Sequence, residues 1–304
     1  MSQPDPTSIG ADDCRYACSW TRGGVTVHRI DETSLPAETG SWLLPDASAD
    51  LIRETTWLFP QFADPVDGSL RLSSHSFAFE LDGRRILVDT GIGNHKPRTN
   101  PAWNQLSTDY LKRLTAVGFA PETVDLVILT HLHTDHVGWN TRLLDGDWVP
   151  TFPTARYLTT EAEWDFWTGQ DLDPPRRQLF ADSVYPVRDS GQLDVLPYRD
   201  QVEVLPGIRL LAMPGHTPGQ VAVELADGAL IITGDAIHHP IQIAHPDLTS
   251  GVDVDPAMAV SSRRRLLDAA AASSATLLGS HFPPPTAGIP RHRSTGYQLQ
   301  TTRG

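Results

Sequence analysis

The residues best suited to chemistry in this chain lie in one short segment, THLHTDHVG (130–138). Three histidines and an aspartate occur there in the order His-x-His-x-Asp-His. Side chains two positions apart point the same way in extended backbone, so His131 and His133 should face one point. As the chain turns after them, Asp135 and His136 can aim at a neighbouring point. The spacing therefore predicts a loop that serves two adjacent metal ions. Zinc suits imidazole and carboxylate ligands, and iron and manganese are the alternatives.

Three further positions have a similar local form. His216 lies in the Gly/Pro-rich turn PGHTPG (214–219), Asp235 ends the segment TGD (233–235), and His281 ends GSH (279–281). Each follows a short apolar run, where a strand is expected to end. Ligand-capable side chains that follow several strands are typical of a site carried by loops on a rigid scaffold.

Strands and helices alternate along the chain and must position these side chains. Strands are expected where short apolar or alternating runs end at turn residues. They are predicted over residues 77–81, 84–89, 124–130, 208–213, 220–225, 229–233 and 276–278. Helices are predicted over residues 106–117 and 256–272, and a third begins at Thr160, where Glu163 completes a capping box. This mixture indicates an α/β layered architecture.

Two segments share one plan. FAFELDGRRILVDTG (77–91) and VAVELADGALIITGD (221–235) each contain an alternating strand, an Asp-Gly turn and an apolar strand that leads to an aspartate. Asp-Gly between two such runs is a strong signal for a hairpin. The repetition is what a fold built from two similar halves would show.

The motifs LTHLHTDHVGW, PGHTPGQ, TGDAI and GSH, in that order, resemble the metallo-β-lactamase superfamily over roughly residues 70 to 285. The resemblance implies a four-layer αββα sandwich of two similar halves. It also implies that His131, His133 and His216 hold a first metal ion. A second would take Asp135, His136 and His281, with Asp235 bridging the two. Asp89, in ILVDTG, would orient the ligands from behind, a support that metal ligands usually need.

The chemistry implied is that of a dinuclear zinc hydrolase. Two cations that share a water lower its pKa until a bridging hydroxide exists at neutral pH, and they also polarise the substrate oxygen. Asp135 or Asp235 is the expected proton carrier to the leaving group. The expected substrate is a small ester, lactone or phosphotriester, with two zinc ions per chain as cofactors.

The layout after TGDAI narrows the choice of substrate. The order of segments there is similar to that in the branch that contains methyl parathion hydrolase and quorum-quenching lactonases. These segments are HHPIQIAHPDLTS, an Arg-rich helix, GSHFPPPTAGIP and GYQL. Only 304 − 281 = 23 residues follow His281, too few for the helical extension of glutathione thioesterases. Acyl-homoserine lactones and other small esters are therefore the leading expectation. His238 and Phe282 are candidates for the wall of the substrate pocket.

Three other functions are alternatives on the same fold. They are an iron-dependent oxygenase similar to persulfide dioxygenases, a β-lactam hydrolase, and a binding module without activity. The oxygenase branch holds a single iron with fewer ligands, whereas this chain keeps all seven. Elemental analysis separates the two, because two zinc ions per chain favour hydrolysis and one iron ion opposes it.

The amino-acid composition limits which partners and which cellular location are expected for the protein. The formal net charge of −13 argues against nucleic acid, and no apolar run approaches the roughly eighteen residues of a membrane span. A small-molecule substrate is the expected partner, with a homodimer as the assembly considered. The start of the chain lacks the basic and apolar features of a secretory signal, so a cytoplasmic location is expected.

Residues 1–20 are expected to be flexible, and 21–304 to form a single hydrolase domain. Cys14 and Cys18 are expected to be reduced thiols.

Overall fold

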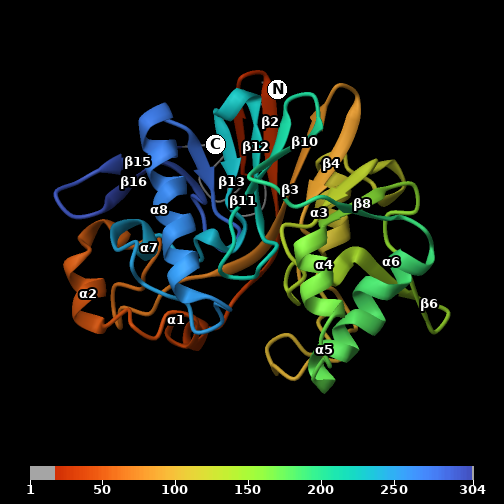
Figure 1. The fold of residues 1–304 in the computed structure, drawn as a ribbon. Coiled ribbons are helices and arrows are strands. Elements are labelled where there is room, and N and C mark those ends of the chain that lie inside the picture. Colours follow the sequence, from red (N-terminus) through yellow and green to blue (C-terminus); the bar gives the residue numbers. More distant parts are fainter. Residues whose placement is uncertain (1–17, 303–304) are drawn as a thin grey trace, which may run out of the picture.

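Two seven-stranded β-sheets form the centre of the structure, a computed structural model that describes residues 18–302 (Figure 1). Most of the segment expected to be flexible, with Cys14, lies outside these residues. The single domain over 21–304 stays a prediction. Within residues 18–302, no helix is both long and apolar enough to cross a bilayer.

The first sheet has the strand order β1-β2-β3-β4-β5-β8-β9. Its strands are β1 (Ser19–Arg22), β2 (Val25–Ser34), β3 (Ser73–Leu81), β4 (Arg84–Val88), β5 (Leu126–Ile128), β8 (Arg156–Thr160) and β9 (Leu193–Leu196). A separate hairpin consists of β6 (Thr141–Leu144) and β7 (Asp147–Pro150).

The second sheet follows chain order from β10 to β16. Its strands are β10 (Gln201–Leu205), β11 (Ile208–Ala212), β12 (Val221–Leu225), β13 (Leu230–Ile232), β14 (Thr276–Leu278), β15 (Ala287–His292) and β16 (Tyr297–Thr301). The sheets thus divide the described chain into two successive halves.

Helices cover the outer faces of the two sheets, with α8 on one side of the molecule and α4 on the other (Figure 1). The α-helices are α1 (Ala37–Leu43), α2 (Ala49–Glu54), α3 (Tyr110–Ala116), α4 (Glu161–Thr168), α5 (Pro174–Leu179), α6 (Tyr185–Asp189), α7 (Ile241–Ala244) and α8 (Pro256–Ser273). A π-helical turn, η5 (Phe180–Val184), joins α5 to α6. The four-layer αββα sandwich expected from the sequence is confirmed.

Alternating side chains explain the layers. On β3, Phe77 and Phe79 enter an apolar core between the sheets, whereas Ala78 faces the core beneath α3 and α4. On β12, Val223 enters the same central core, and Ala222 faces the core beneath α8. Because strand side chains alternate, each sheet presents one apolar face to the other sheet and one to its helices.

The similarity between the two halves appears as a shared pattern of pairing. Strand β3 pairs antiparallel with β4, which pairs parallel with β5. Strand β12 likewise pairs antiparallel with β13, which pairs parallel with β14. The parallel pairs end at one edge of each sheet, so the loops that follow them emerge together. Those loops contain Asp89, the segment 131–136, Asp235 and His281.

Two predicted elements are shorter than expected. The strand expected over 124–130 is β5 (Leu126–Ile128), because the Thr130 amide donates to the Asp89 carboxylate at 2.8 Å instead of to a neighbouring strand. The helix expected over 106–117 is α3 (Tyr110–Ala116), because Asn94 Oδ1 accepts from the Thr108 amide at 2.8 Å and draws that segment into a loop.

We expect Phe79→Ala to lower the free energy of unfolding by about 3–5 kcal/mol. The ring is fully buried between the sheets, so its loss leaves a cavity that both sheets line. Urea denaturation measures the change. Val195→Ala on β9, where the side chain is 42% exposed, is the control and should shift stability by less than about 0.5 kcal/mol. Equal effects of the two substitutions would contradict the placement of the central core.

Candidate metal centre

The seven side chains expected to bind metal converge at the edge where the two sheets meet. His131, His133, Asp135 and His136 come from the loop after β5, in the first half. His216, Asp235 and His281 come from the loops after β11, β13 and β14, in the second half. The loops are thus far apart in sequence but adjacent in space.

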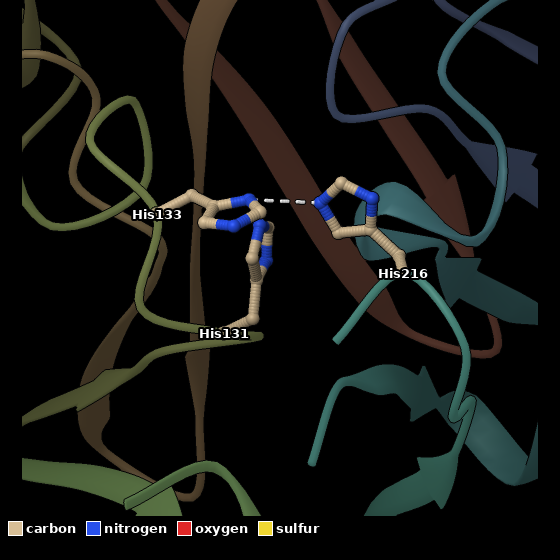
Figure 2. Close-up of side chains that lie close together, drawn as sticks. All are labelled: His131, His133 and His216. Carbon is tan, nitrogen blue, oxygen red and sulfur yellow. Dashed lines mark hydrogen bonds between the residues drawn. The ribbon is translucent and has the colours of Figure 1, made fainter. Parts of the chain in front are cut away.

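The first group consists of His131, His133 and His216, with one nitrogen of each within 4.8 Å of the others. Figure 2 shows the first two rings extending from one loop and the ring of His216 approaching from the opposite half. Nδ1 of His133 and Nε2 of His216 are 2.9 Å apart. The ring centroid of His131 lies 4.7 Å from that of His133 and 4.9 Å from that of His216. Three ring nitrogens therefore surround one small volume.

The second group consists of Asp135, His136 and His281, also within 4.8 Å of one another. Asp135 Oδ2 lies 3.6 Å from Nε2 of His281, and Asp135 Oδ1 lies 3.9 Å from Nε2 of His136. The Nε2 atoms of His136 and His281 are 3.3 Å apart.

Asp235 lies between the two groups. Its Oδ1 is 3.2 Å from Nε2 of His281 and 3.4 Å from Nε2 of His136. Its Oδ2 is 3.5 Å from Nε2 of His216 and 3.8 Å from Nε2 of His131. Oδ2 also lies 3.3 Å from Nε2 of His281, so the carboxylate contacts ligands of both groups, as a bridging ligand must.

The donor set fits two zinc ions. Ligand atoms around a tetrahedral zinc at about 2.1 Å lie roughly 3.4 Å apart. The separations above run from 2.9 Å to 3.9 Å and include this value. Nε2 of His131 and Oδ1 of Asp235 are buried, and no protein atom within residues 18–302 forms a hydrogen bond with either. Buried polar atoms normally have a hydrogen-bond partner, so these two unpaired atoms indicate that the site binds a further group, such as a metal ion.

The electrostatics of the site also favour cations. Burial, together with the neighbouring imidazoles, lowers the pKa of His131 and of His133 well below the ordinary value, so both rings are neutral. Burial also lowers the pKa of His136, but the carboxylates of Asp235 and Asp89 outweigh it and raise that pKa well above 6.5. Burial opposes ionisation of Asp235, yet the surrounding histidines hold its pKa well below 3.8. Without metal, protons on histidines such as His136 therefore offset the negative charge of the carboxylates. Metal binding would displace these protons.

Asp89 contacts the ligand loop from behind. Its Oδ2 lies 2.8 Å from Nδ1 of His136 and accepts from the Thr130 hydroxyl at 2.8 Å. Its Oδ1 accepts from the Thr130 amide. Because Nδ1 of His136 is engaged, Nε2 is left to face the centre.

A second supporting carboxylate, Asp253, was not found from the sequence. Its Oδ1 lies 3.1 Å from Nδ1 of His216, and its Oδ2 accepts from the Ser250 amide at 2.8 Å. The residue lies 37 positions from its histidine in a loop without a recognisable motif. It fixes the His216 ring as Asp89 fixes that of His136.

The centre opens into a cavity of about 860 Å³. One wall is formed by α1 with residues 251–254, and the other by residues 97–104 with α5 and Phe180. Six side chains of the centre reach this cavity, namely His133, Asp135, His216, Asp235, His238 and His281.

The two expected pocket residues differ in position. His238 lines the cavity, with Nε2 3.4 Å from Oδ2 of Asp235 and neither ring nitrogen hydrogen-bonded to the part of the chain described. Phe282 does not line it: the ring is fully buried in the core beneath α8, with its centroid 6.5 Å from that of Phe62. The expectation for Phe282 was therefore wrong, because the ring packs among the apolar side chains of that core and not at the cavity.

Comparisons with known families and proteins show that the chain is similar to metallo-hydrolases. The model of the metallo-beta-lactamase superfamily matches residues 70–281. The chain is 31% identical over 121 residues to the probable metallo-hydrolase YflN of Bacillus subtilis (strain 168), a match that covers 36% of this chain and 44% of YflN. The chain thus spans less than half the length of that relative. It is 24% identical over 212 residues to the N-acyl homoserine lactonase AiiA of Bacillus thuringiensis subsp. kurstaki, covering 65% of this chain and 76% of AiiA.

Solved structures share the fold over nearly the whole chain. The hydrolase AbOPH has a TM-score of 0.74 at 22% identity and covers 95% of this chain and 98% of its own. AidC, a dizinc quorum-quenching lactonase, has a TM-score of 0.73 at 20% identity with the same coverage. At these identities the likeness shows the fold.

We expect Asp253→Ala to weaken zinc binding by about 10–100-fold, because the His216 ring loses the partner that orients it. Zinc retained against a competing chelator measures the change. Asp247→Ala is the control, since Asp247 lies on the same stretch of chain but pairs with Arg264 at an exposed site. Equal zinc retention in the two variants would show that Asp253 has no role in holding the metal.

Removal of metal should lower the melting temperature. The buried carboxylates and imidazoles lose the cations that offset their desolvation, and any ligand that binds the folded state stabilises it. Differential scanning calorimetry before and after chelation checks this, and added zinc should restore the original value. A melting temperature that does not depend on zinc would count against a metal site at this position.

Proposed function

Because the chain belongs to the metallo-beta-lactamase superfamily, we propose that it is a hydrolase that uses two zinc ions to cleave lactone or ester bonds in small molecules. The observation that carries this proposal is the pair of three-residue groups joined by Asp235. One group supplies three imidazoles, and the other supplies two imidazoles and a carboxylate. Such a set suits a pair of divalent cations better than a single one.

The chemistry supplied by bound zinc would be Lewis acidity, which makes a water acidic and polarises a substrate carbonyl. The protein's own part is to hold the reacting groups and to move protons. Asp135 is suited to the second task, since its side chain is 14% exposed and reaches the cavity. Asp235 is almost fully enclosed between the two groups and is better suited to bridging. We therefore propose that a carboxylate oxygen of Asp135 takes up the proton that the attacking water loses and delivers it to the leaving alkoxide.

The cavity supports an uncharged substrate with an apolar part. Trp42, Leu43 and Val252 line one wall, and Leu179 and Phe180 line the other. The cationic side chains at the cavity are already paired: Arg98 contacts Asp182 at 2.7 Å, and Arg176 contacts Asp173 at 2.6 Å. A substrate anion would have to compete for them.

An acyl-homoserine lactone combines a small polar ring with an apolar chain, and it fits this division between a polar floor and apolar walls. The names of AiiA and AidC support the same class. Aryl esters and phosphotriesters are the comparison substrates. The comparisons favour neither the iron-dependent oxygenase nor the β-lactam hydrolase.

The zinc-loaded protein should hydrolyse N-hexanoyl-homoserine lactone with a higher kcat/KM than an aryl ester, a phosphotriester or a cephalosporin. A panel assay on one preparation, with the metal content measured beside it, checks the order. Turnover that is highest on the cephalosporin, or absent on every substrate with two zinc ions bound, would overturn the proposed function.

His133→Ala and Asp235→Ala should each remove at least one zinc ion and reduce kcat/KM by more than the roughly 10–100-fold that loss of a supporting residue costs. Circular dichroism should show that both variants remain folded. His292→Ala, an exposed histidine on β15, is the matched control and should retain the activity of the original protein. Full zinc content and normal turnover in both site variants would contradict the ligand assignment.

A further inference from the structure

Glu163, in the first turn of α4, is a buried carboxylate with an unusual set of partners. Only 1% of the residue is exposed. Its Oε1 accepts from the Leu132 amide at 2.9 Å and from Nε1 of Trp167 at 2.6 Å. Its Oε2 accepts from the Gly219 amide at 3.2 Å. Both oxygens of one side chain are therefore occupied by donors from separate parts of the chain.

The two backbone donors belong to the loops that carry the first group of ligands. Leu132 lies between His131 and His133, and Gly219 lies three residues after His216 in PGHTPG. These loops come from the two halves of the fold. In sequence, Glu163 lies 31 positions after Leu132 and 56 positions before Gly219. A single carboxylate thus links the loops whose spacing determines the geometry of three imidazoles.

The neighbours of Glu163 strengthen this link. The Trp167 ring, which donates to Glu163, packs edge-on to the His133 ring at a centroid distance of 5.5 Å. The hydroxyl of Thr160 donates to the Gly219 carbonyl at 2.7 Å. A Cβ atom at Gly219 would lie 2.0 Å from the Glu163 amide nitrogen, so only glycine allows this close approach. The first turn of α4 and the His216 loop therefore lie in direct backbone contact.

Only one of the two hydrogen bonds of the expected capping box forms at this helix. The Glu163 carboxylate, which would accept the other, bonds elsewhere. Thr160 accepts from the Glu163 amide at 3.3 Å, as a capping residue does. The Glu163 carboxylate does not return to the Thr160 amide but turns toward the two loops. Burying a carboxylate opposes its ionisation, and it is tolerated when several donors surround it.

We propose that Glu163 is a positioning residue that fixes the distance between the His131–His133 loop and the His216 loop, and thereby sets the zinc affinity of that group. This inference rests on the two-zinc centre of the proposed function. The second group should depend on it less. His136 is held by Asp89, and Nδ1 of His281 lies 3.1 Å from the Ser73 carbonyl.

The test is zinc retention in Glu163→Gln. The amide keeps the shape of the side chain but replaces one acceptor with an NH₂ donor, so the Leu132 or the Gly219 amide loses its partner. We expect one of the two zinc ions to be lost at a chelator concentration about 10–100-fold lower than in the original protein. The other should be released at the original concentration. Elemental mass spectrometry across a chelator titration gives both values without an activity assay.

Two control variants separate positioning from general destabilisation. Glu161→Gln removes an exposed carboxylate from the same helical turn and should retain both zinc ions. Glu32→Gln alters a carboxylate that is similarly buried, but its donors, Ser74, Ile92, Gly93 and Trp139, lie outside the segments 131–133 and 214–219. It should lower the melting temperature without the selective loss of one zinc ion.

The outcomes are distinct. Retention of both zinc ions by Glu163→Gln, as in the original protein, would overturn the role of Glu163 and leave the proposed function intact. Loss of both ions at the same lowered concentration would also overturn it, since the effect would not be confined to one group. An original protein that binds no zinc would overturn the proposed function itself. If Glu163→Gln fails to fold, Glu163→Asp keeps the charge on a shorter side chain that cannot span both amides, and the same selective loss is expected.

Discussion

The burial of many ionisable side chains in one small volume is the constraint on which the rest of the structure depends. Five of the seven ligand side chains are buried there, and the other two, His133 and Asp135, are partly exposed at the cavity. Removing charged groups from water is costly unless opposite charges compensate. In the protein alone, the raised pKa values of His136 and His281, which the Asp235 carboxylate sustains against burial, provide part of that compensation. Two divalent cations would provide it more completely and would engage Nε2 of His131, which has no hydrogen-bond partner in the described chain.

The architecture makes this gathering possible because one simple unit occurs twice. In each half, an antiparallel hairpin is followed by a parallel strand, and the loops after the parallel pair carry ligands. The halves meet through an apolar core, so neither sheet fixes the centre by itself. Supporting carboxylates complete the arrangement. Asp89 orients a ligand of the first half and Asp253 a ligand of the second, whereas Glu163 bonds to loops of both.

The sequence predicts the ligands that follow a strand directly, whereas contacts between distant segments cannot be predicted from local pattern. The ligands could be predicted because each follows an apolar strand within a few residues, as the apolar run 124–130 precedes His131. The alternation and Asp-Gly turns likewise predicted the repeated hairpins. Asp253 could not be found, since its role depends on a histidine 37 positions away that folding alone brings close. The spacing of Thr160 and Glu163 predicts only a helix cap, because local pattern gives no sign that the Glu163 carboxylate turns toward loops of other elements.

X-ray diffraction at wavelengths on either side of the zinc absorption edge tests the central claim most directly. Crystals of the protein grown with zinc should give two anomalous peaks. One should lie among His131, His133 and His216, the other among Asp135, His136 and His281, with a carboxylate oxygen of Asp235 next to each. A single peak, or peaks elsewhere on the molecule, would show that the buried side chains are stabilised in some other way and that the two-metal account is wrong.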